Sequence, residues 1–212
     1  MKPQDHENDE VESQNQAINP YVEFELETFK GLLDDRVILY NDVVNKSVIE
    51  RVVLPLTALA NKSNAPIKLL INSPGGSVED GQMVVDAIIS SPAPVVTIAL
   101  GQAMSAAFDI FLAGDKRIVY PNTILMMHSG ATRFDTLTLP QHNMEAALHK
   151  AYFERWSTWY ASRTNITKDK WLEMLGTGLN YYMFPEDALK SGVVHEVIQP
   201  IKKSITKKKF KI

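Results

Sequence analysis

The sequence contains no cysteine among its 212 residues. This absence excludes disulfide bonds, thiol nucleophiles and cysteine-ligated metals, so covalent catalysis would need another side chain. No apolar run approaches the roughly 18 consecutive residues needed to span a bilayer. The amino terminus also lacks the basic start and apolar core of a secretory signal. We therefore expect a soluble, cytoplasmic protein that does not bind a membrane.

The two ends of the chain have too little apolar content to fold. Residues 1–19 are polar and acidic, and we predict that they form a disordered arm, because such a segment cannot offset its own ordering entropy. Residues 201–212 form a lysine-rich basic tail, interpreted as a solvated end, with nucleic-acid contact as the alternative. The remaining residues, 20–200, have a length that suits one domain.

Short apolar runs alternate with helical patterns through this domain. Strands are predicted at residues 36–40, 67–71, 95–100, 117–120, 124–127 and 193–198. Helical spacing follows the second strand at 84–89, a small-residue helix ends at Gly114, and shorter helices are predicted at 167–176 and 185–191. Ser47 and Glu50 have the spacing of a capping box that opens a further helix, which Pro55 is expected to kink. The alternation predicts an α/β fold built from crossover units.

The longest helical pattern runs from about residue 140 to 163. Its apolar and aromatic side chains, including Met144, Trp156 and Trp159, form one broad stripe. This stripe is larger than a compact domain of this size needs. Part of it is therefore expected to face another subunit, with ordinary core packing as the alternative.

A glycine-rich turn follows the second predicted strand at residues 72–76. It lacks the Gly-Lys-Ser/Thr ending of a phosphate loop and the spaced glycines of a dinucleotide fingerprint, so nucleotide binding is not supported. Adjacent glycines can also present backbone N–H groups to an oxyanion that forms during a reaction. The other interpretation is a turn that merely reverses the chain.

Ser105 lies among small residues where a buried strand passes into a helix. A serine in this position is accessible, and the helix amino terminus offers free N–H groups to an oxyanion beside it. A serine can equally be a helix N-cap.

A nucleophilic serine needs a base, and of the five histidines only His128 directly follows an apolar strand, where this class of sheet commonly builds its site. His142 and His149 are seven residues apart on the long helix and would need a third ligand to bind a metal, so no metal is expected.

These segments resemble the Clp protease proteolytic subunit (ClpP) family, and the match covers residues 31–198. The segments that carry it are GLLDDRVI (31–38), INSPGG (71–76), GQAMSAA (101–107), and PN (121–122) followed by MMH (126–128). The resemblance implies that Ser105 is the nucleophile and His128 its general base, with the N–H groups of Gly76 and Ala106 as the oxyanion hole. The catalytic aspartate of the family falls on Asn180. The charged pair before that aspartate, linked to ring–ring assembly, is replaced here by Gly178-Leu179.

The resemblance further implies a fold, an assembly and a partner. The fold is the spiral of repeated β-β-α units shared with crotonases, with the long helix as a handle. The assembly is a heptamer or tetradecamer of stacked rings that encloses the active sites, and the partner is a hexameric AAA+ unfoldase ATPase. No cofactor or metal ion is implied in this chain itself.

Three functions follow as hypotheses. The first is a serine endopeptidase that cleaves unfolded polypeptides or peptides inside a ring chamber, with activity reduced by Asn180. The second is a weak or inactive subunit with a structural role in a mixed ring, which Asn180 favours. The third is a crotonase-type acyl-CoA enzyme, against which the spacing of Ser105 and His128 argues.

Overall fold

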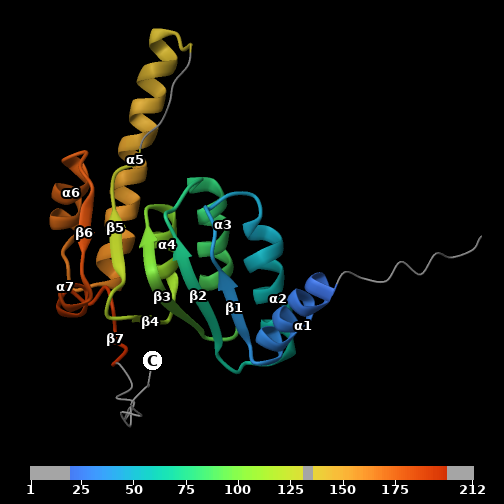
Figure 1. Ribbon diagram of the computed structural model, residues 1–212. Coiled ribbons are helices and arrows are strands. Elements are labelled where there is room, and N and C mark those ends of the chain that lie inside the picture. The colour runs from blue at the N-terminus through green and yellow to red at the C-terminus, as the bar shows by residue number, and fades with distance from the viewer. Residues whose placement is uncertain (1–19, 131–135, 200–212) are drawn as a thin grey trace, which may run out of the picture.

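The computed structural model describes residues 20–130 and 136–199 of the chain (Figure 1). The predicted disordered arm, 1–19, and basic tail, 201–212, lie outside the described residues. The helices are α1 (Pro20–Asp34), α2 (Leu54–Lys62), α3 (Val78–Ile89), α4 (Ala106–Ala113), α5 (Leu139–Arg163), α6 (Lys168–Gly176) and α7 (Pro185–Lys190). The strands are β1 (Val37–Tyr40), β2 (Ile67–Ser73), β3 (Val95–Met104), β4 (Lys116–Val119), β5 (Ile124–Met127), β6 (Tyr181–Met183) and β7 (Glu196–Val197). No helix in these ranges is both long and apolar enough to cross a membrane.

The strands form one sheet of seven, in the order β1-β2-β3-β4-β7, with β5 paired to β3 and β6 paired to β5. Every pairing is parallel except that of β5 with β6. Parallel strands need crossover connections, and here helices supply most of them, which is why strand and helix patterns alternate in the sequence. The α/β class predicted from that alternation is confirmed.

Strand β3 changes its partner halfway along its length. Its first half pairs with β4 from Val96 to Ala99, and its second half pairs with β5 from Gln102 to Met104. The register with β2 shifts between these halves, where Gly101 has φ of 80°. A residue in this left-handed region is typical of a bulge, which bends and twists a strand. The bulge therefore carries the end of β3 away from β4 and alongside β5.

The hydrophobic core lies between the sheet and helices α2 to α4. Almost all of α4 is buried, and its Phe108 and Phe111 are fully covered. Trp171 of α6 is also fully buried, and it contacts both Phe108 and Tyr160 of α5. The aromatic cluster thus joins the carboxyl-terminal part of α5 to the helix that follows Ser105.

Helix α5 extends well beyond the rest of the molecule (Figure 1). Its bounds agree with the predicted long helix, but only Ser157 and Tyr160 are buried along its length. The predicted apolar stripe divides into two parts. Trp156 and Trp159 pack against the core, whereas Met144, with 73% of its surface exposed, belongs to a set of apolar residues left open to solvent. Core packing therefore accounts for the carboxyl-terminal part of the stripe, and the contact of the exposed part with another subunit stays a prediction.

The predicted capping box at Ser47 and Glu50 is wrong. The chain after Ser47 forms a π-helical turn, Ile49–Val53, with no side-chain cap. The Oδ1 atom of Asn45 instead accepts a hydrogen bond from the N–H of Ser47 at 2.8 Å, a local turn that competes with the capping arrangement. Pro55 then lies in the first turn of α2, which continues directly from the π-helical turn, since the N–H of Leu54 donates to the carbonyl of Ile49.

Several element bounds also differ from those predicted. Strand β3 continues four residues past the predicted end at residue 100, because Gly101 forms a bulge within the strand instead of ending it. The closing strand covers only Glu196–Val197 of the predicted range 193–198. Helix α1 and the three-residue strand β6 were not predicted. Strand β6 is short and is recognisable only from its pairing with β5.

Candidate active site

Ser105 occupies a strained position between β3 and α4. Its φ and ψ angles are 53° and −128°, a region that residues other than glycine rarely adopt. Its N–H donates to the carbonyl of Met126 on β5 at 2.8 Å. Its side chain makes no capping hydrogen bond, so the alternative that Ser105 is an ordinary N-cap is wrong. Strain of about 1–3 kcal/mol at one residue favours a functional role, because the surrounding structure must hold the residue in place.

Ser105 and His128 are in direct hydrogen-bond contact. The Ser105 Oγ and His128 Nε2 atoms are 2.7 Å apart, although 23 positions separate the residues in sequence. The contact follows from the sheet, since Met104 at the end of β3 pairs with Met126 of β5, and each residue lies one or two positions beyond that pair. With Nε2 facing the hydroxyl, the ring can accept the serine proton at that atom. The predicted nucleophile and base are thus brought together.

The glycine turn after β2 lies against Ser105. A Cβ atom added to Gly75 would lie 2.7 Å from Cβ of Ser105 and 3.1 Å from the nitrogen of Ala106. The carbonyl of Gly75 and the N–H of Ser77 both hydrogen-bond to the backbone of Val44. This pairing anchors the turn from both sides.

The two residues predicted to supply the oxyanion hole are Gly76, in the glycine turn, and Ala106, at the start of α4. The N–H of Gly76 is not part of the pairing with Val44, which uses the residues on either side of it. The N–H of Ala106, the first residue of α4, has no intrahelical acceptor. The dipole of α4 adds positive potential at the same end.

Asn180 and His128 each lie one residue beyond the paired strands β5 and β6, and no hydrogen bond joins them within the described residues. Met127 of β5 pairs with Tyr181 of β6, so one further step in this antiparallel register sets His128 opposite Asn180. Within the described residues, the Asn180 side chain bonds elsewhere: its Nδ2 atom donates to the hydroxyl of Tyr182 at 3.3 Å. The predicted third residue therefore lies at the same end of the β5–β6 pair as the histidine, and no three-residue chain is formed within the described residues.

A half-buried carboxyl group that was not predicted from the sequence lies on α4, one turn beyond Ser105. Asp109 accepts a hydrogen bond from the hydroxyl of Tyr160 on α5. Burial raises the pKa of Asp109 to about 7, an effect that outweighs the lowering by the Tyr160 hydroxyl. Burial also raises the pKa of Tyr160 well above its ordinary value, and the neighbouring Asp109 adds to that rise. The pair links the helix that begins beside Ser105 to the long helix α5.

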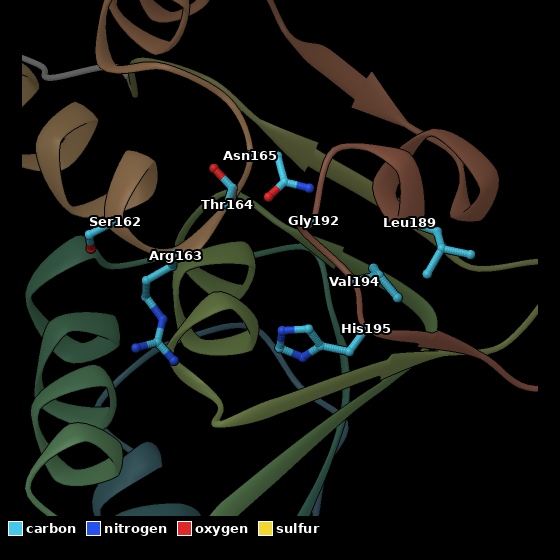
Figure 2. A pocket seen from close by; sticks show the side chains of 8 residues that line it. All are labelled: Ser162, Arg163, Thr164, Asn165, Leu189, Gly192, Val194 and His195. Carbon is cyan, nitrogen blue, oxygen red and sulfur yellow. The ribbon is translucent and has the colours of Figure 1, made fainter.

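A separate hollow of about 460 Å³ opens where α5 ends (Figure 2). Its walls come from the end of α5 and the following loop, with Arg163 and Asn165, and from the segment before β7, with Gly192 and His195. None of Ser105, His128 or Asn180 lines it. The guanidinium of Arg163 donates to three carbonyls at the end of α4, those of residues 112, 113 and 114.

The buried Arg117 hydrogen-bonds to several segments of the same region. Its guanidinium donates to the carbonyls of Val193, Gly192 and Arg163. Burial and, as the next cause, the nearby Arg163 lower its pKa to about 10. Burial also lowers the pKa of His195, with Arg117 as the next cause. Backbone carbonyls thus accept hydrogen bonds from both guanidinium groups, and we interpret the hollow as a structural joint between α4, α5 and the chain before β7.

The fold and these contacts define an α/β protein with a serine–histidine pair beside a glycine turn. Comparison with known proteins gives the family: the Clp protease family model matches residues 22–201, and the chain belongs to this family. The chain is 31% identical to the ATP-dependent Clp protease proteolytic subunit of Deinococcus radiodurans over 192 residues, which cover 86% of this chain and 93% of the relative. It is 32% identical to proteolytic subunit 2 of Gluconobacter oxydans, over 79% of this chain and 75% of the relative.

A solved structure has the same fold. It is an asparagine-to-aspartate mutant of ClpP1 from Listeria monocytogenes, with a TM-score of 0.73 and 28% sequence identity. The similarity covers 82% of this chain and 97% of that one. The spiral ClpP-like fold predicted from the sequence is therefore confirmed.

Proposed function

We propose that this chain is a serine endopeptidase that cleaves unfolded polypeptides and peptides by acyl transfer. The single observation that carries the proposal is the 2.7 Å contact between Ser105 Oγ and His128 Nε2. The strained backbone of Ser105 and the glycine turn beside it support the same assignment. Membership in the Clp protease family favours this function over the acyl-CoA chemistry that the sequence also suggested.

The reaction begins with proton transfer from Ser105 to Nε2 of His128. The serine oxygen attacks the peptide carbonyl, and the N–H groups of Gly76 and Ala106 stabilise the resulting oxyanion. When the tetrahedral intermediate collapses, the C–N bond breaks and His128 gives its proton to the leaving amine. Water, activated by His128, then attacks the acyl ester in the same way, which releases the acid and restores the Ser105 hydroxyl.

The proposal includes a ring assembly working in the cytoplasm with a partner that consumes ATP. The relatives named above are proteolytic subunits of ATP-dependent Clp proteases. On this chain, the solvent-exposed apolar residues of α5 are Leu139, Met144, Leu148 and Tyr152. Exposed apolar side chains on a projecting helix are typical of an interaction surface. We infer rings of about seven subunits, single or stacked, fed with unfolded chains by an AAA+ ATPase.

A weak or inactive subunit in a mixed ring is the second candidate. Asn180 favours it, because an amide in place of the aspartate of the family has no negative charge to stabilise the His128 imidazolium. Such a subunit would keep the fold and the assembly surfaces and contribute little turnover of its own.

Labelling with a fluorophosphonate separates the two candidates. A serine whose proton can move to a nearby base reacts readily with this probe, so intact-mass spectra of the parent protein should show one adduct. The adduct should be lost in Ser105→Ala and in His128→Ala. Thermal unfolding of each variant serves as the control for folding. A folded parent protein that acquires no adduct would refute the peptidase and support the inactive subunit.

A further inference from the structure

An asparagine that orients a catalytic histidine must turn its amide oxygen, and not its NH₂ group, toward the ring. An aspartate has no such requirement, because its two oxygens are equivalent. With Nε2 of His128 accepting from Ser105, the other ring nitrogen, Nδ1, carries a hydrogen and needs an acceptor. Either oxygen of a carboxylate can serve. The amide of Asn180 has one oxygen that accepts and one NH₂ group that donates, and the NH₂ group would oppose the Nδ1–H group.

The structure supplies a group that holds the NH₂ end of this amide. The Tyr182 hydroxyl accepts a hydrogen bond from Asn180 Nδ2 at 3.3 Å. Asn180 directly precedes β6 and Tyr182 lies two positions further on, a spacing that puts two side chains on the same face of an extended chain. With Nδ2 engaged by the phenol oxygen, Oδ1 is the end of the amide that remains to accept from His128.

The register of β5 and β6, continued by one residue pair, sets Asn180 and His128 opposite each other. Within the strands, Tyr182 pairs with Met126. Directly opposed residues in an antiparallel pair have Cβ atoms about 4.5–5.5 Å apart, which is within reach of an asparagine and a histidine side chain. Asn180 is exposed, and without a fixed partner its amide would rotate freely.

We propose that Tyr182 is a positioning residue, whose hydroxyl fixes the Asn180 amide with Oδ1 directed to Nδ1 of His128. The inference rests on the proposed function and adds a residue to its site. The relevant feature is the hydroxyl group alone, since a phenylalanine at this position would keep the aromatic ring and lose the acceptor. The hydroxyl matters only while residue 180 is an amide.

The test is a double-mutant cycle on peptide hydrolysis. Tyr182→Phe is measured in the parent and in an Asn180→Asp background, with kcat and KM determined separately on a short fluorogenic peptide. In the parent, kcat should fall about fivefold, the factor expected for one hydrogen bond, while KM stays unchanged. In the Asn180→Asp background the same substitution should change kcat less than twofold, because a carboxylate needs no fixed orientation. Such rescue is not expected of a residue with a merely structural role.

Tyr181→Phe is the matched control. It removes a hydroxyl from the neighbouring position, on the opposite face of β6, and should leave both kinetic constants unchanged. The inference is overturned if Tyr182→Phe matches the parent, or if it lowers kcat equally in both backgrounds. A parent protein whose Ser105 is not labelled by a fluorophosphonate contradicts the proposed function itself, and the inference fails with it. These outcomes are distinguishable, because labelling is measured before the cycle begins.

Discussion

Replacing Asp109 with asparagine should make the protein more stable at alkaline pH. Asp109 is half-buried, and its carboxyl group accepts a hydrogen bond from the hydroxyl of Tyr160. The amide of Asp109→Asn keeps an oxygen that can accept this hydrogen bond, and it carries no charge at any pH. The substitution therefore isolates the free energy of burying the carboxylate from that of the contact with α5.

The size of the expected stability change follows from the raised pKa of the Asp109 carboxyl group. Burial raises the pKa of Asp109 from 3.8 to about 7, so the folded state holds its proton more tightly than the unfolded state does. Stability from this group is fully present below pH 3.8 and is lost as the pH rises through 7. Between pH 5 and pH 8 the parent should lose about 2.5 kcal/mol through this group, at about 1.4 kcal/mol per pKa unit.

The assay is urea unfolding followed by tryptophan fluorescence at pH 5, 6, 7 and 8. Trp171 is fully buried and contacts Tyr160, so its emission reports on this region. Parent and Asp109→Asn proteins are compared at one protomer concentration, because assembly shifts apparent stability. Other titrating groups cancel in the difference between the two proteins. That difference should grow by about 2.5 kcal/mol from pH 5 to pH 8 in favour of the variant. A difference that does not change with pH would show that Asp109 is not titrating in this range and refute the reasoning.

Three further predictions concern the site and the assembly. In Gly76→Ala the new Cβ would lie 2.1 Å from the carbonyl oxygen of Val44, so the turn must shift. Fluorophosphonate labelling should slow by about 10²-fold, as expected for loss of one oxyanion donor, and an unchanged rate would exclude this N–H group from the oxyanion hole. Asn180→Asp should raise peptide turnover near neutral pH by supplying a charge that stabilises the His128 imidazolium, whereas Asn180→Ala should lower it; if both variants match the parent, Asn180 is not the third member. Sedimentation should show particles of about 7 or 14 subunits that dissociate in Met144→Glu, and a stable monomer at micromolar concentration of the parent would contradict the ring.

The sequence by itself determined the class of the fold and the two central residues of the candidate site. Alternating apolar runs and helical patterns are local signals, and they located β1, β2, β4, β5 and the long helix α5 close to their final bounds. Ser105 and His128 were singled out because each follows an apolar strand, where the carboxyl ends of strands gather side chains. The resemblance to the Clp protease family implied that these two residues act together as nucleophile and general base.

Only the tertiary structure decided how β3 passes beyond Gly101 and which group the Asn180 side chain contacts. A glycine in a strand pattern fits a turn as well as a bulge, and only pairing with β2 and β5 distinguishes them. The three residues of β6 form a strand only because β5 pairs with them, so the sequence could not reveal that Tyr182 hydrogen-bonds to Asn180. The contact between Asp109 and Tyr160 likewise joins residues 51 positions apart. Long-range contacts of this kind depend on how the elements pack, and local sequence patterns do not encode them.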